Sequence, residues 1–98
     1  MNNFDFLKKL GFDDAHVMEA NNIFNEEIKK TIMDNIDTVT TNIGYLRVLG
    51  ISNYQEAFLR FYNMFLMEPS SFDDIFAKYD KDDLVAKLEK NIAILEHL

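Results

Sequence analysis

The sequence predicts an all-α fold, a compact bundle of about five short helices formed by a single domain over residues 1–98. One proline and three glycines in 98 residues leave few turns, whereas a β-sandwich needs many. Apolar residues instead recur at steps of three and four, which is the period of a helix. They make up 48% of the chain and include nine Phe and four Tyr, which is enough material for a core.

The first two helices are predicted over residues 3–10 and 15–24. Gly11 follows Leu10 and supplies the left-handed conformation that ends the first helix. Asp13 or Asp14 then caps the second helix, because a carboxylate at this position accepts from a free backbone N–H.

The third helix, over residues 25–49, has the most regular apolar period in the chain. Its apolar face steps by three and four through Ile28, Ile32, Ile36, Val39, Ile43 and Leu46. The β-branched run 38–41 and Gly44 lower its helix propensity. We therefore expect a bend or short break near residues 37–42, and an end at Gly50.

The fourth helix is predicted over residues 53–67, ending before Pro69. Ser52 and Gln55 have the spacing of a capping box. A short helix at 72–79, capped by Ser70 or Ser71, comes next. The last helix starts at Asp80 or Asp82, and its apolar side runs through Leu84, Leu88, Ile92 and Leu95.

Charge and composition exclude several classes of function. The chain carries a net charge of −7, and each quarter of it is net negative, so no basic patch forms. We therefore do not expect direct binding to nucleic acid or to anionic membranes. Cysteine is absent, and the longest apolar run, residues 64–67, is far shorter than a membrane helix. The N-terminal residues lack a signal peptide pattern, so we expect a cytoplasmic protein.

No pattern of catalytic, cofactor-binding or metal-binding residues is present. His16 and His97 stand alone, and the acidic pairs 13–14, 73–74 and 82–83 fall at helix starts, where capping explains them. A calcium loop counted from Asp80 would need Gly and Glu where Val85 and Asn91 stand. Glycine-rich phosphate loops are missing. We expect neither an enzyme nor a bound cofactor or metal.

A faint internal repeat joins several helix ends. Residues 6–12 align with 45–51, and residues 42–46 align with 91–95. These Leu-Gly helix ends resemble the repeats of the mitochondrial termination-factor family, a resemblance that implies a helical repeat array that binds nucleic acid. Any helix that carries leucines on one side and ends at a glycine gives the same match. The first pair of segments is 39 residues apart and the second 49, so the spacing is not that of a regular repeat. Because the chain is also acidic, no function is carried over from this family.

The predicted fourth helix is unusually apolar. Its apolar residues fill an arc of roughly 220°, about twice the stripe that an ordinary surface helix needs. A central position in the bundle explains the face with Tyr54, Phe58, Phe61 and Phe65. The other flank, consisting of Leu59, Tyr62 and Leu66 with Met67 beside them, is the predicted partner-binding surface.

The predicted function is that of a small acidic interaction module that binds a protein partner through this flank, or itself as a homodimer. The alternative is an acidic inhibitor or nucleic-acid mimic that occupies a basic groove on another protein. Nucleic-acid binding through helical repeats is a third hypothesis, which the acidic charge opposes.

Overall fold

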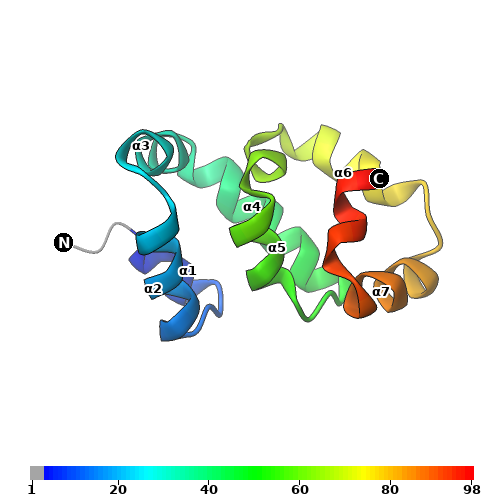
Figure 1. Cartoon of the computed structure of the whole chain (residues 1–98). Helices are drawn as coiled ribbons and strands as arrows, with labels where there is room; N and C mark the ends of the chain where they lie inside the picture. Colours follow the sequence, from blue (N-terminus) through cyan, green and yellow to red (C-terminus); the bar gives the residue numbers. More distant parts are fainter. Residues whose placement is uncertain (1–3) are drawn as a thin grey trace.

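A computed structural model describes residues 4–98, and over this range the chain is all-α, as predicted. The predicted start of the first helix at residue 3 lies outside the described residues. The chain forms more helices than the five expected (Figure 1). In order they are α1 (Asp5–Lys9), α2 (Asp14–Ile23), α3 (Glu26–Asp34), α4 (Ile36–Leu49), α5 (Tyr54–Arg60), the 3₁₀ helix η1 (Tyr62–Leu66), α6 (Pro69–Ala77), α7 (Lys81–Lys90) and the 3₁₀ helix η2 (Ile92–His97).

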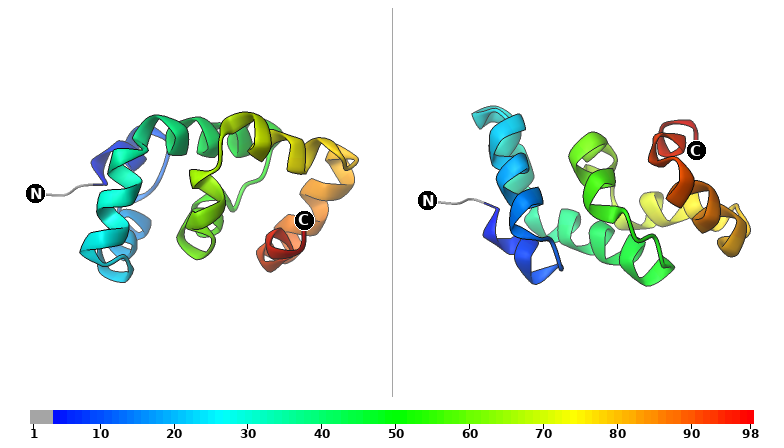
Figure 2. Two further views of the ribbon diagram at one scale, coloured as in Figure 1. Left: turned by 90° about the horizontal axis from the view of Figure 1, so that it is seen from above. Right: turned by 60° about the horizontal axis from the view of Figure 1, so that its bottom comes forward.

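Helix α4 lies at the centre and packs against α3, α5, η1 and α6. In Figure 2, α4 and α6 run end to end along one side of the molecule. The α1–α2 pair, α5, and α7 with η2 stand side by side against them. The molecule is accordingly elongated, with extents of 41 × 25 × 22 Å. We predicted the fourth helix near the centre, and its α5 part does contact α2, α4, η1 and η2.

Two glycines end helices as predicted. Gly11 and Gly50 have φ of 95° and 101°, in the left-handed region. The N–H of the next residue, Phe12 or Ile51, returns to a carbonyl of the last helical turn, and both of these side chains are buried. The aligned residues 6–12 and 45–51 therefore form the same turn. The second alignment fails, because 42–46 lies inside α4 whereas 91–95 begins η2.

The capping predictions are partly confirmed. Asp13 accepts from the His16 N–H at 2.8 Å, and Asp80 accepts from the Asp83 N–H at 3.0 Å. The predicted capping box at 52–55 does not form: Ser52 donates to Glu89, and the Gln55 side chain accepts from the backbone of Asp13. No serine caps the next helix either, because α6 begins at Pro69.

Three helices break where the apolar period alone predicts continuity. The break in the third helix lies at Asn35 rather than near 37–42, and the threonines of that run stay helical inside α4. The last helix stops at Asn91, so Ile92 and Leu95 belong to η2. The fourth helix breaks at Phe61, where φ is −131°, and continues as η1. Asn35 and Asn91 each hydrogen-bond locally to the backbone, which competes with the helical ladder.

Aromatic rings form a continuous spine through the core. Successive ring centroids lie between 5.0 and 5.9 Å apart, and the planes are tilted or edge-on. The spine runs from α1 to α6 through Phe4, Phe24, Phe58, Phe65, Phe72 and Phe76. Because Phe58 and Phe65 sit in the middle of this spine, it anchors both α5 and η1 to the rest of the molecule.

Candidate partner-binding surface

The break at Phe61 separates the predicted flank into two parts. Leu59, in α5, is only 6% exposed and belongs to the core. Tyr62, Leu66 and Met67 lie beyond the break and are half-buried, with part of each side chain at the surface. The predicted flank requires one continuous α-helix, whereas a 3₁₀ segment has fewer residues per turn. The register of α5 therefore does not extend into η1.

Tyr62 and Leu66 come together in a hollow between η1 and α3. The hollow has a volume of about 250 Å³ and is lined by Glu27, Ile28, Thr31, Tyr62, Asn63 and Leu66. The Tyr62 ring also packs edge-on against Phe24 of the aromatic spine, with the two ring centroids 5.1 Å apart. This contact holds the ring at the border between the core and the surface.

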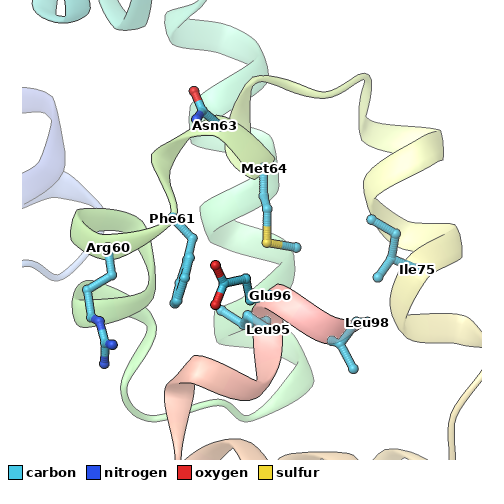
Figure 3. Close-up of a pocket in the computed structure, with 8 residues that line it drawn as sticks. All are labelled: Arg60, Phe61, Asn63, Met64, Ile75, Leu95, Glu96 and Leu98. Atoms are coloured by element: carbon cyan, nitrogen blue, oxygen red, sulfur yellow. The ribbon is translucent and has the colours of Figure 1, made fainter.

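A second hollow lies on the other side of η1 and has a volume of about 500 Å³. Its wall combines residues of α5, η1, α6 and η2, shown in Figure 3: Arg60, Phe61, Asn63, Met64, Ile75, Leu95, Glu96 and Leu98. Met64 extends from η1 toward η2, and the Glu96 side chain extends from η2 toward Phe61. Phe61, which we placed on the core-facing side, lines this hollow instead.

Asn63 lines both hollows, so they adjoin at this exposed residue of η1. We name the two hollows together with Met67 the η1 surface. It joins the predicted Tyr62, Leu66 and Met67 to apolar residues that the sequence analysis missed, on α3, α6 and η2. No local signal in the sequence places those residues beside η1, because they come from separate helices.

Asn42 of α4 fixes the position of η1. Its side chain is fully buried, and Nδ2 donates to the carbonyls of Phe65 at 3.0 Å and Met67 at 2.9 Å. Oδ1 of the same amide is buried and has no hydrogen-bond partner among the described residues. Asn42 is not among the site residues predicted from the sequence. A signal was present, since Asn42 lies three residues after Val39 and four before Leu46, on the apolar face of its helix.

The charges around the η1 surface are mainly acidic. Arg60 is engaged on its own helix, with Nη1 3.6 Å from Glu56 and the guanidinium 5.4 Å from the Phe61 ring centroid. Glu27 and Glu96 are exposed, and neither carboxylate has an ion pair within residues 4–98. The carboxylates of Glu27 and Glu96 therefore border the apolar η1 surface, and the cation that lines it, Arg60, is already paired with Glu56.

The perturbed titratable groups lie away from this surface. The His16 N–H and side chain lower the pKa of the exposed Asp13 carboxyl by hydrogen bonding to it. Burial, with the Asp73 charge nearby, raises the pKa of Tyr45. Within residues 4–98 no three acidic or His side chains cluster as metal ligands would, and no helix has the length and apolarity to cross a bilayer.

Comparison with protein-family models, curated proteins and solved structures finds no match to this chain. The resemblance of the Leu-Gly helix ends to the mitochondrial termination-factor family therefore has no family match behind it.

Proposed function

We propose that this protein is a non-catalytic interaction module that binds a protein partner, or a second copy of itself, through the η1 surface. The observation that carries the proposal is the pair of hollows that share Asn63, both lined mainly by half-buried apolar side chains. Tyrosine is enriched at interface hot spots, and methionine adapts its shape to a partner. Tyr62, Met64 and Met67 supply both kinds of side chain here.

The way η1 is held also favours binding. The hydrogen bonds from Asn42 and the packing of Phe65 on Phe58 at 5.5 Å attach η1 to α4 and α5. A surface ordered before the partner arrives loses less conformational entropy on binding.

Photo-crosslinking tests the proposal, with a photoreactive residue in place of Asn63 and, as control, in place of Met18, which is 64% exposed on α2. We expect a discrete adduct from position 63 that disappears when Tyr62→Asp and Leu66→Asp are added. The mass of the purified protein across a dilution series then shows whether the adduct is a homodimer. An equal adduct from position 18, or no adduct from position 63, would contradict the proposal.

The acidic inhibitor or nucleic-acid mimic is the second candidate, which the net charge of −7 favours. Binding that depends on charge alone is lost as salt is raised, whereas binding through the η1 surface keeps the contribution of its apolar contacts. Titration of the isolated partner at low and high ionic strength separates the two functions.

A further inference from the structure

The chemistry of the η1 surface also defines what kind of partner fits it. We infer that its occupant is a basic amphipathic segment of another protein, with apolar side chains in the two hollows and Lys or Arg side chains against Glu27 and Glu96. This inference rests on the proposed function and names the partner class for the same site.

The apolar part of the partner follows from the lining of the hollows. Ile28, Tyr62 and Leu66 line the first, and Met64, Ile75 and Leu95 are among the residues of the second. Both hollows open to the surface on either side of η1, and Asn63 is the one residue they share. A segment that crosses η1 at Asn63 therefore places an apolar side chain on each side of it, as an amphipathic helix lays one face into a groove.

The basic part follows from the charges. Each hollow contains one carboxylate that has no ion pair within residues 4–98, Glu27 in the first and Glu96 in the second. Arg60 would repel a cation, but Glu56 already balances its charge. A cationic side chain that docks at either hollow therefore meets an unpaired acid, and the −7 charge of the whole chain attracts the segment at longer range.

The same charges disfavour a second copy as the occupant. A two-fold interface places one patch against the same patch of the partner, so the free carboxylates would approach hollows that are themselves acidic. Two chains of −7 also repel each other as whole bodies. A basic segment relieves both repulsions.

The test uses a synthetic peptide of about four helical turns, with Leu along one face and Lys along the other. A second peptide carries Glu in place of Lys, and a third has the composition of the first in scrambled order. Affinity for the full chain is measured by calorimetry, and the bound surface is mapped by NMR amide shifts. We expect the basic amphipathic peptide to bind about tenfold or more tightly than either comparison peptide and to shift the amides of residues 61–67.

The matched variants separate the site from the overall charge. Glu27→Lys with Glu96→Lys reverses the two acids of the hollows. Glu19→Lys with Glu89→Lys makes the same change in net charge at exposed positions that line neither hollow. We expect the first pair to weaken binding about tenfold, because it places cations against the Lys side chains of the docked peptide. The second pair should weaken binding less than about threefold, since those positions act on the peptide only at long range, where salt screens their charge. Circular dichroism confirms that each variant is folded.

Three results would overturn the inference. Equal loss in both pairs of variants would show attraction to the whole acidic body rather than to a site. Equal binding of the Lys and Glu peptides would show an apolar partner that need not be basic. Failure of all peptides to bind, with dimers that Tyr62→Asp dissolves, would make a second copy the occupant. The last two results would leave the proposed function standing, and only the crosslinking experiment would refute it.

Discussion

Replacement of Asn42 by Leu tests how η1 is held in place. The substitution removes two hydrogen-bond donors, of which one serves the buried carbonyl of Phe65 and the other the partly buried carbonyl of Met67. A buried polar group left unpaired costs about 1–3 kcal/mol, and a partly buried one less because water can reach it. The change also removes the unpaired Oδ1, which offsets part of the loss. The free energy of unfolding should fall by about 2 kcal/mol.

Urea denaturation followed by circular dichroism measures this change, and a thermal melt should show the midpoint lowered by roughly 10 °C. Asn42→Asp should be worse, since a carboxylate is acceptor-only and repels both carbonyls. Asn22→Leu, at an exposed position of α2, is the matched control and should change stability little. An Asn42→Leu protein as stable as the unmodified chain would refute the proposed role of this amide.

Three further predictions concern the turns, the core and the titration of a cap. Gly50→Ala should lower the free energy of unfolding by about 1 kcal/mol because φ there is 101°, whereas Gly44→Ala should raise it by up to about 1 kcal/mol, since an added Cβ meets nothing within 4 Å. Urea denaturation in which the two substitutions change the free energy of unfolding in the same direction would contradict this. Leu59→Ala should lower the free energy of unfolding by about 2–5 kcal/mol because Leu59 is buried, and Leu66→Ala should lower it by less than about 1.5 kcal/mol because Leu66 is half-buried. Equal decreases for the two substitutions would contradict this difference in burial. The pKa of the Asp13 carboxyl, measured by carbon-detected NMR, should lie below 3.8. The stability that the ionised carboxylate contributes is therefore present above pH 3.8 and is lost as the pH falls through the lowered pKa of the folded protein. A measured pKa at or above 3.8 would contradict the capping role of Asp13.

Local signals in the sequence predict the helix ends that local chemistry determines. Gly11 and Gly50 need the left-handed conformation whatever packs around them, and Asp13 and Asp80 cap the turns that follow them directly. The breaks in the middle of apolar patterns have another origin. The apolar period of three and four residues continues across Phe61. This period indicates which side chains face the core, but it does not indicate whether the helical backbone hydrogen bonds continue. At η1 two carbonyls bond to Asn42, more than twenty residues away in sequence.

The same limit explains the outcome for the candidate site. A helical wheel over residues 53–67 places Leu59 beside Tyr62 and Leu66, but the break at Phe61 separates them, and Leu59 lies in the core. The hollows depend on α3, α6 and η2, whose positions relative to η1 follow from tertiary packing alone. The excess of apolar residues in this segment was visible in the sequence, whereas the shape of the surface that they form was not.

Oxidative footprinting of the methionines inside the cell tests the η1 surface most directly, because the chain contains its own control. Met64 and Met67 belong to that surface, whereas Met18 is exposed on α2, away from both hollows. If a partner covers the surface, oxidation of Met64 and Met67 relative to Met18 should be several-fold lower in the cell than in the dilute purified protein. An unchanged ratio would show that the η1 surface is bare where the protein works.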